Sequence, residues 1–229
     1  MTQRLTGISS MATRAMLADL LALYRPADGC APQMQSVGGV DAAKRILAGE
    51  VFDVVVLASD AIERLIAAGW LLQGSRVDLV HSGVAVAVPA GAALPDISTE
   101  SALRSAVLGA RSIGTSTGPS GVKLAQLFER WGIAELIQPR TVVAPPGVPV
   151  GALVARGEAA LGFQQLSELI HQAGIQVVGL LPPTVQINTT FSAGVGSTAN
   201  QPQAARALIE FLASPQAGEA KLRHGMTPA

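Results

Sequence analysis

The sequence predicts an α/β protein of two Rossmann-like lobes that are joined by two crossover strands. Three observations lead to this fold class. Short apolar runs alternate along the chain with segments of helical periodicity, which is the order that builds parallel sheets covered by helices. The run "VVVLA", from Val54, is apolar at every position, as strands buried on both faces are. Two long extended runs, at 78–91 and 185–196, carry the chain onward without a helix and fit the two crossovers.

The first lobe begins with three pairs of a strand and a helix. Each strand is a short apolar or alternating run, and each helix has apolar residues along one face. The tail at 202–225 is also helical and is expected to pack on this lobe, so the lobe has two segments, 1–81 and 190–229. In chain order, the predicted elements are strand 4–9, helix 10–24, strand 32–37, helix 39–50, strand 52–59 and helix 60–71.

The second lobe, residues 82–189, repeats this order after the first crossover. The Pro- and Gly-containing stretches between its elements are short enough to be loops within one lobe. We expect a ligand cleft between the two lobes, because loops at the carboxyl ends of strands face such clefts. The predicted elements are strand 110–117, helix 120–132, strand 140–146, helix 148–158, a mixed apolar segment 159–170 and strand 175–182.

Composition and charge exclude several classes of function. Sixteen Lys and Arg balance sixteen Asp and Glu without any basic run, so nucleic acid is not an expected partner. No apolar run reaches the roughly 18 residues that a membrane span needs. The single cysteine, Cys30, excludes a disulfide within the chain, and we expect it to be a small apolar filler. No metal or other cofactor is predicted, because the chain has no phosphate loop, nucleophile motif or metal cluster.

The amino terminus bears on where the protein acts. It lacks the layout of a signal peptide, in which a charged stretch precedes an apolar one. We therefore expect a cytoplasmic protein. The alternative is a mature periplasmic form from which the signal has been removed.

Small residues occupy four loops at which a helix is predicted to start. The first N–H groups of a helix have no helical acceptor, and the helix dipole adds partial positive charge, so a helix start can hold an anion without Lys or Arg. Hydroxyl groups add further donors. Each loop by itself also fits an ordinary helix cap or a tight turn. The candidate ligand-binding residues of the loops and strand ends are Ser9, Ser10, Gly38, Gly39, Ser59, Thr117, Gly118, Ser120, Gly121, Gly147 and Val148.

The junctions and the stretches around them resemble the molybdate-binding proteins of ABC importers, which have the type II periplasmic-binding-protein fold. The resemblance covers nearly the whole chain, and "LVARGEAALGF", from Leu153, is its most specific part. It implies two lobes that close on a small anion, with the membrane subunits of an ABC transporter as partners. The other matching stretches are "ISSMA", "GGVDAAKRI", "FDVVVLASD", "GSRVDLVHSGVAVAVP", "GPSGVKL" and "FLASPQAG".

Two positions depart from the molybdate-binding pattern. A second oxyanion-ligating serine of the family falls near Val40, where the hydroxyl is missing. The family's tyrosine after "GF" falls at Gln165. Gln164 and Gln165 offer amide groups instead, and Val40 stays a candidate for ligand contact by its position. These departures favour a larger ligand than molybdate, such as an organic carboxylate.

Three side chains are candidate acids or bases. His81 lies at the first crossover, where it could contact a ligand or transfer a proton, or form a hydrogen bond with the backbone. Asp60 follows the third strand and fits either a helix cap or a carboxylate of the cleft. Glu168 lies four residues after Gln164 on one helix, facing either the cleft or solvent.

Three functions remain open at this point. The leading interpretation is a substrate-binding protein that closes two lobes on a small anion, either a molybdate-type oxyanion or an organic carboxylate, with the carboxylate favoured. The alternative is a cytoplasmic isomerase of an unsaturated di- or tricarboxylate, because the resemblance extends to aconitate isomerase. Such a reaction needs one base and firm anchoring of the carboxylates. The third is a cytosolic sensor for the same ligand.

Overall fold

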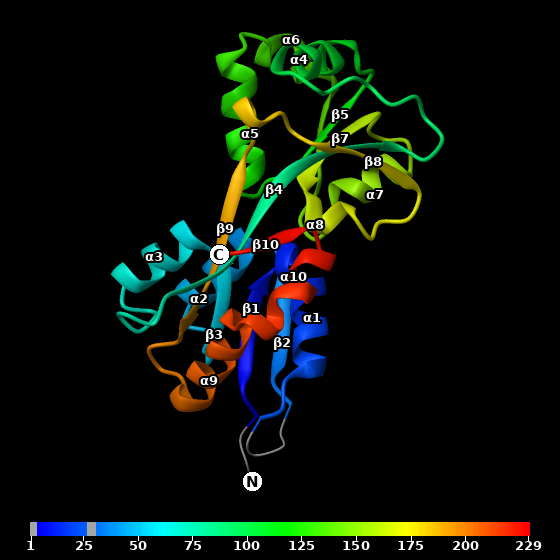
Figure 1. The fold of residues 1–229 in the computed structure, drawn as a ribbon. Helices are drawn as coiled ribbons and strands as arrows, with labels where there is room; N and C mark the ends of the chain where they lie inside the picture. The colour runs from blue at the N-terminus through cyan, green and yellow to red at the C-terminus, as the bar shows by residue number, and fades with distance from the viewer. Residues whose placement is uncertain (1–3, 27–30) are drawn as a thin grey trace. The chain divides into compact units, whose positions relative to one another are not determined.

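The computed structural model describes residues 4–26 and 31–229 (Figure 1), so Cys30 lies outside the described residues. The chain forms two compact units. Unit 1 consists of Met1–His81 and Thr189–Ala229, and unit 2 of Ser82–Asn188. Strands β4 (Val77–Pro89) and β9 (Asn188–Val195) run from one unit into the other. That the units are the two lobes of a ligand-binding protein stays a prediction.

Unit 1 contains a sheet in which β1 lies between β2 and β3 and is parallel to both. Beyond β3 the sheet continues with β9, which is antiparallel to β3 and pairs Val54 with Val195. The carboxyl ends of the three parallel strands therefore lie at one edge, where each is followed by a helix. The parallel strands are β1 (Thr6–Ser10), β2 (Gln33–Val37) and β3 (Val54–Ala58).

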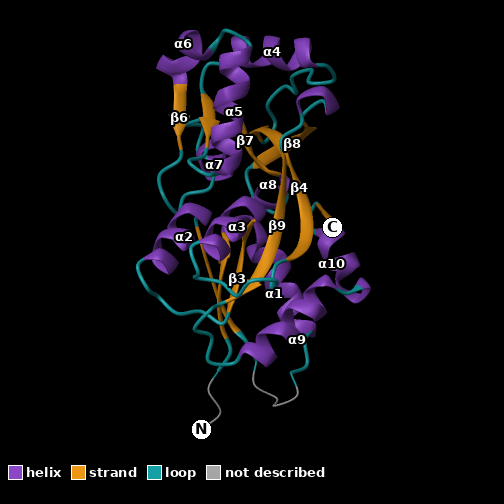
Figure 2. Ribbon diagram, turned by 90° about the vertical axis from the view of Figure 1, so that its left-hand side faces the viewer, coloured by secondary structure: helices purple, strands orange, loops and turns teal. Residues whose placement is uncertain are grey.

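Helices cover both faces of the unit 1 sheet. This arrangement buries β3, which is apolar at every position, on both of its sides. Val54 and Val56 belong to the core that α1, α9 and α10 cover, and Val55 and Leu57 belong to the core under α2 and α3. Figure 2 shows α2 and α3 on one side of these strands and α9 and α10 on the other. The remaining elements of unit 1 are η1 (Met11–Thr13), α1 (Arg14–Leu23), α2 (Gly39–Leu47), α3 (Ser59–Ala67), α9 (Pro202–Ala213), η4 (Pro215–Ala217), α10 (Gly218–Arg223) and β10 (Met226–Pro228), which pairs with β4.

Unit 2 has a mixed sheet. Strand β5 is parallel to β6 and β7, whereas β7 and β8 are both antiparallel to β4. In β4 the larger residues Val84, Val86 and Val88 enter one core, while Ala85 and Ala87 pack against a different one. The four further strands are β5 (Ile113–Thr115), β6 (Thr141–Val143), β7 (Leu161–Gln165) and β8 (Ile175–Leu180).

The helices of unit 2 cover its sheet on both faces as well. Leu103 of α4 and Leu124 of α5 are buried with Val84 and Phe163, while Val150 and Val154 of α7 form a separate apolar cluster. The helical elements are α4 (Glu100–Gly109), α5 (Pro119–Arg130), α6 (Ala134–Ile137), η2 (Gln138–Arg140), α7 (Val150–Ala155), α8 (Leu166–Leu169) and η3 (Pro183–Val185).

The predicted α/β class is confirmed, and one long helix was not predicted. Helix α4 lies between the first crossover and β5, a stretch for which the sequence analysis proposes no element. A signal for it was present. Thr99 caps the helix by accepting a hydrogen bond from the Ala102 N–H at 3.1 Å, and Leu103 and Val107 are buried at helical spacing.

Candidate anion-binding site

In unit 1, two of the predicted loops meet. Strand β1 ends at Ser10, and helix α2 begins at Gly39 with Gly38 as its cap. A Cβ atom added at Gly39 would lie 3.7 Å from the Ser10 Oγ, so the hydroxyl stands beside the start of α2. Ser10 also accepts a hydrogen bond from the Ala12 N–H at 3.4 Å. This end of the unit 1 sheet therefore combines a hydroxyl with the unpaired N–H groups of a helix start.

Ser9 has a different role from the one predicted. Its side chain is fully buried, and its Oγ is 2.8 Å from the Oγ of Ser36 on the neighbouring strand β2. The two serines are paired in the register of the sheet. Ser9 therefore stabilises the pairing of β1 with β2, and Ser10 alone of the two serines lies at the helix start.

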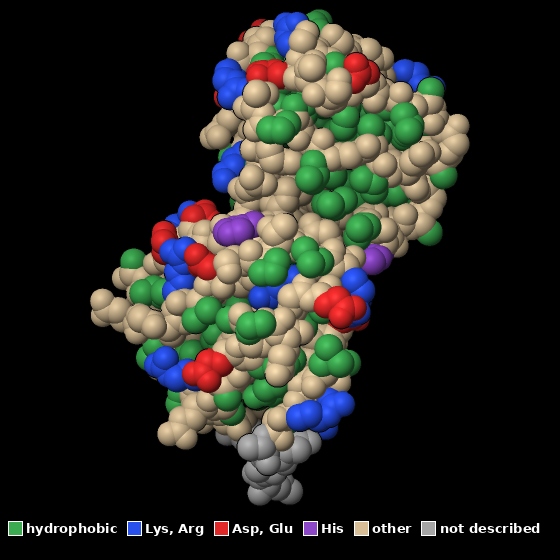
Figure 3. Space-filling model, viewed as in Figure 1, with side chains coloured by type: hydrophobic (Ala, Val, Ile, Leu, Met, Phe, Trp, Pro, Cys, Tyr) green, Lys and Arg blue, Asp and Glu red, His purple; other side chains and the backbone are tan. Residues whose placement is uncertain are grey.

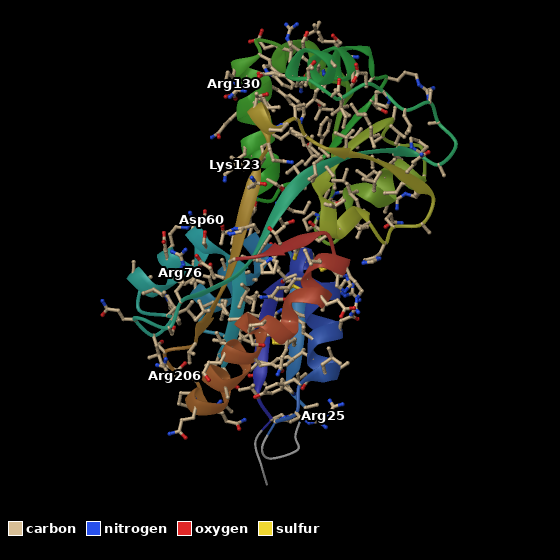
Figure 4. The ribbon with its side chains drawn as sticks, in the orientation of Figure 1. Arg25, Asp60, Arg76, Lys123, Arg130 and Arg206 are labelled. Atoms are coloured by element: carbon tan, nitrogen blue, oxygen red, sulfur yellow. The ribbon has the colours of Figure 1, made fainter. Side chains whose placement is uncertain are left out.

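Acidic residues already occupy the first turns of α2 and α3. The Asp41 Oδ2 would lie 3.1 Å from a Cβ added at Gly38, so this carboxylate contacts the start of α2. In α3, Ser59 is the first helical residue, and the exposed Asp60 forms an ion pair with Arg64 at 3.1 Å. Figure 4 shows Asp60 at the beginning of α3. Both helix starts carry a negative charge of their own, which weakens their attraction for an anionic ligand.

The start of α5 carries no acidic residue and is the most favourable of these junctions for an anion. Gly118 is the cap, and Pro119, which has no N–H, takes the first helical position. Val122 donates its N–H to the Gly118 carbonyl at 3.1 Å, so the N–H groups of Ser120 and Gly121 precede the first helical hydrogen bond. A Cβ at Gly121 would stand 1.8 Å from the Ser116 carbonyl oxygen, which explains why the corner needs glycine there.

The two hydroxyl residues predicted at this corner, Thr117 and Ser120, differ in their exposure to solvent. Thr117 is exposed in the loop before α5, and Ser120 is buried in the first turn. The basic residue nearest in sequence, Lys123, points away from α5 in Figure 4 and donates to the Asn188 carbonyl at 3.5 Å. The corner therefore offers backbone N–H groups and hydroxyls rather than a basic side chain.

Gly147 and Val148 precede α7 instead of starting it. Gly147 has a φ of +78° and is exposed in a turn, in which the Val148 N–H donates to the Pro145 carbonyl at 3.0 Å. Helix α7 begins only at Val150. The prediction that these residues present unpaired N–H groups at a helix start is therefore wrong for Val148, whose N–H is already paired.

A chain of hydrogen bonds links α7, β7 and α8. The Gly151 N–H donates to the Gln164 Oε1 at 3.3 Å, and the Gln164 Nε2 donates to the Glu168 Oε1 at 2.8 Å. Gln164 and Gln165 are buried at the end of β7. Burial raises the pKa of Glu168 to about 7, although the hydrogen bond from Gln164 acts in the opposite direction. Glu168 is thus a carboxyl group that can hold or release a proton near neutral pH.

His81 lies on β4 at the end of the first segment of unit 1. Its side chain is exposed, and its Nδ1 is 2.9 Å from the Oγ1 of Thr190 on β9. The partner is therefore a hydroxyl and not the backbone group that the sequence analysis considered. This contact joins the two strands that connect the units.

Other kinds of site would need a patch of one charge, a cluster of metal ligands or a long apolar helix. Lys and Arg alternate with Asp and Glu on the face shown in Figure 3. Within 4–26 and 31–229, no three His, Cys, Asp or Glu side chains come together as a metal site would require. No helix of the described chain is long and apolar enough to cross a membrane.

Several polar groups of unit 2 were not identified from the sequence. The Gly151 N–H, which orients Gln164, could not have been found, because it reaches Gln164 only through the packing of α7 on β7. The hydroxyls of Ser82 and Ser167 are buried and have no hydrogen-bond partner among the described residues. The prediction that Gln164 and Glu168 lie on one helix is wrong, because Gln164 lies on strand β7 and Glu168 on helix α8.

Comparison with known proteins identifies relatives along the whole chain. Residues 5–227 match the sequence profile of a family described as bacterial extracellular solute-binding protein. An aconitate isomerase of a Pseudomonas species is 38% identical over 230 residues, which cover 98% of this chain and 87% of that protein. The molybdate-binding protein ModA of Escherichia coli is 27% identical over 109 residues, covering 48% of this chain and 42% of its own.

A solved structure is similar in fold. The periplasmic molybdate-binding protein of Azotobacter vinelandii superposes with a TM-score of 0.82 at 21% sequence identity, covering 98% of this chain and 99% of the other. Together with the family match, this similarity confirms the predicted type II periplasmic-binding-protein fold.

Proposed function

The chain belongs to the bacterial extracellular solute-binding protein family, and on that basis we propose that it binds a small organic carboxylate. The observation that carries the proposal is the start of α5, where two N–H groups precede the first helical hydrogen bond and no acidic residue competes. Unit 1 has a comparable corner of its own, where the Ser10 hydroxyl stands beside the start of α2. The family description favours the periplasmic of the two predicted locations, with transporter membrane subunits as partners.

The preference for a carboxylate over molybdate rests on the two departures from the molybdate-binding pattern. Val40 is an exposed apolar side chain in the first turn of α2, where the resemblance expects a serine. Gln165, where it expects a tyrosine, is buried at the end of β7. An amide can both donate and accept hydrogen bonds, which suits a ligand with several carboxyl oxygens and hydroxyls.

Titration calorimetry with cis-aconitate, trans-aconitate, citrate, molybdate and sulfate tests this proposal. We expect at least one carboxylate to bind more tightly than molybdate by tenfold or more. Submicromolar binding of molybdate together with weak binding of every carboxylate would show that the ligand class is wrong.

The same measurement on two matched variants tests the α5 corner. Asp and Asn are both good helix caps, and a side chain at Gly118 has free space, since a Cβ there would be 3.9 Å from its nearest neighbour, the Ser116 Oγ. Gly118→Asp adds a negative charge to the helix start, whereas Gly118→Asn does not. We expect Gly118→Asp to weaken carboxylate binding by tenfold or more and Gly118→Asn to change it by less than threefold. Equal affinities of the two variants would remove the corner from the site.

A second candidate function is isomerisation of the bound carboxylate. The observation that favours it is the 38% identity to an aconitate isomerase over 98% of the chain. In such a reaction a base removes a proton from the methylene carbon, the double bond shifts by one carbon, and a proton returns to the former alkene carbon. No redox partner is needed.

Proton NMR of cis-aconitate in heavy water tests the second candidate. Conversion to the trans isomer, with deuterium entering the carbon skeleton, is the expected result for an isomerase. A wild-type protein that binds the carboxylate without conversion or deuterium uptake would be a binding protein only.

A further inference from the structure

The structure separates the three acid or base candidates of the sequence by their surroundings. Asp60 is exposed and forms an ion pair with Arg64, and His81 is exposed and bonded to Thr190. Glu168 is partly buried at the start of α8 and has a neutral partner, Gln164. A proton-transfer group is most effective when its surroundings exclude water and counter-charges that would hold it in one protonation state.

The orientation of Glu168 is fixed by a relay that begins in the backbone. Because the Gln164 Oε1 accepts from the Gly151 N–H, the other end of the amide, Nε2, is turned toward Glu168. The Nε2 then donates to the Oε1 of Glu168 at 2.8 Å. Figure 1 shows β7 running into α8 beside α7, the three elements that hold this relay. One carboxyl oxygen is thus held in place, while the other, Oε2, has no hydrogen-bond partner among residues 4–26 and 31–229.

Few charges surround this carboxyl group. The unit 2 part of β4, β7 and β8, against which α8 packs, contain no charged residue. Helix α7 is followed by Arg156, which is exposed and bonded to Glu158, and α8 is followed by His171. Desolvation is therefore the dominant influence on Glu168, and it brings the pKa to about 7.

Two unpaired hydroxyls belong to the elements that surround Glu168, helix α8 and strand β4. Ser167, its neighbour on α8, and Ser82 on β4 are both buried without a recorded partner within the described chain. Ser82 is two residues from Val84, which pairs with Gln165 at the end of β7. A buried unpaired hydroxyl costs free energy, so a ligand oxygen that reached these groups would be stabilised.

We propose that Glu168 is the residue that transfers the proton in the isomerisation, and that Gln164 positions it. This inference rests on the second candidate function given above. The ionised Oε2 accepts the proton from the methylene carbon, and the electron pair of the broken C–H bond forms the shifted double bond. The same oxygen then returns the proton to the former alkene carbon, which restores the carboxylate.

Two variants test the assignment, with an exposed carboxylate as control. Glu168→Gln keeps the oxygen that accepts from Gln164 but cannot take up a proton. We expect it to lower the isomerisation rate by about 10²–10⁴-fold while calorimetry shows carboxylate affinity within tenfold of the wild type. Glu129→Gln, on the exposed side of α5, should leave both quantities unchanged.

Gln164→Leu distinguishes positioning from a structural role. The wild-type rate should rise with pH and level off above about 7, because the ionised carboxyl group acts as the base. Without the Gln164 hydrogen bond, which lowers the pKa of Glu168, the midpoint of this profile should move to higher pH. A lower rate with an unchanged midpoint would overturn the positioning role.

Failure of this inference and failure of the proposed function give different results. If Glu168→Gln keeps more than a tenth of the wild-type rate, the assignment is wrong and the isomerase function stands. If the wild type binds carboxylates without exchanging a proton, the assignment is wrong and carboxylate binding stands. If no carboxylate binds to the wild type, both are wrong.

Discussion

Gly121 decides how closely the loop before α5 can approach the helix. Its Cα faces the carbonyl oxygen of Ser116, and a Cβ there would come within 1.8 Å of that oxygen. Three residues earlier, at the helix cap, Gly118 has no such neighbour. Two glycines of one short loop therefore have different reasons to be present, which their spacing in the sequence does not show.

We expect Gly121→Ala to destabilise the protein by about 1–3 kcal/mol, because the added methyl group forces the backbone apart. Gly118→Ala should destabilise the protein by no more than about 0.5–1 kcal/mol. The added methyl group has room there, and only the preference for Gly over Ala as a helix cap is lost. Urea denaturation measures both changes. An equal loss of stability in the two variants would mean that the Ser116 contact does not govern the corner.

The protonation state of the Glu168 side chain affects the stability of unit 2. Its pKa is about 7 in the folded protein and near 4.5 in the unfolded chain. The folded state therefore favours the protonated form, so stability is highest below about pH 4.5, falls as the pH rises through this interval, and is constant above about 7. This direction is opposite to that of a carboxylate held by an ion pair.

Glu168→Gln should accordingly stabilise the protein at pH 8 by up to about 3 kcal/mol, the free-energy equivalent of the pKa difference. At pH 4, where the carboxyl group is already protonated in both states, the variant should match the wild type. Chemical denaturation at the two pH values measures the effect. A stabilisation that is the same at pH 4 and pH 8 would contradict the raised pKa.

Asp53 holds together elements that are distant in the chain. The side chain is buried, and it accepts hydrogen bonds from the Thr6 N–H at 2.8 Å and from the Gln201 N–H at 3.0 Å. These contacts connect the start of β1, the start of β3 and the segment that leads into α9. Asp53, which follows the turn after α2, thus fixes how the carboxyl-terminal helices join the rest of unit 1.

Asp53→Ala should lower the free energy of unfolding by about 1–3 kcal/mol, because the partly buried N–H groups of Thr6 and Gln201 lose their acceptor. Asp96→Ala is a suitable control, since this exposed carboxylate also accepts a backbone N–H, that of Ser98, at 2.8 Å. We expect the control to lose clearly less stability, because its carboxylate and the bond that it accepts are exposed to solvent. Similar losses in urea denaturation would show that burial of Asp53 is not what matters.

The whole molecule contains separate cores for the two units. The apolar clusters of unit 1 draw on residues 5–80 and 191–226, and those of unit 2 on residues 84–187. Leu208 of α9 and Leu103 of α4 are both fully buried, one in each unit. Local damage to one core should therefore be felt first within its own unit.

Leu208→Ala and Leu103→Ala test this separation as a matched pair, each expected to cost about 2–5 kcal/mol. Hydrogen exchange followed by mass spectrometry should show faster exchange of the β1 and β3 amides in Leu208→Ala, and of the β5 and β7 amides in Leu103→Ala. Faster exchange throughout the chain in both variants would mean that the units unfold together.

Local patterns along the chain were sufficient for most of the fold. Helical periodicity gave α2, α3, α5 and α9, and the apolar run from Val54 gave β3, because burial on one or both faces dictates where apolar residues occur. The start of α2 at Gly39 and that of α5, expected at Ser120 and found at Pro119, followed from small residues at the ends of strands. Helix α4 shows the limit, since its cap at Thr99 is a weak signal beside the strong alternation of the preceding crossover.

Only the tertiary structure decided what the individual side chains of the candidate site do. Ser9 and Ser10 are equivalent in sequence, but the pairing of β1 with β2 gives the Ser9 hydroxyl to Ser36 and leaves Ser10 beside α2. Asp60 fitted a helix cap or the cleft, and Glu168 fitted the cleft or solvent. Packing of α8 on an uncharged sheet buries only Glu168 of the two. Hydrogen bonding and desolvation depend on neighbours that are far apart in the chain, so no local pattern could assign these roles.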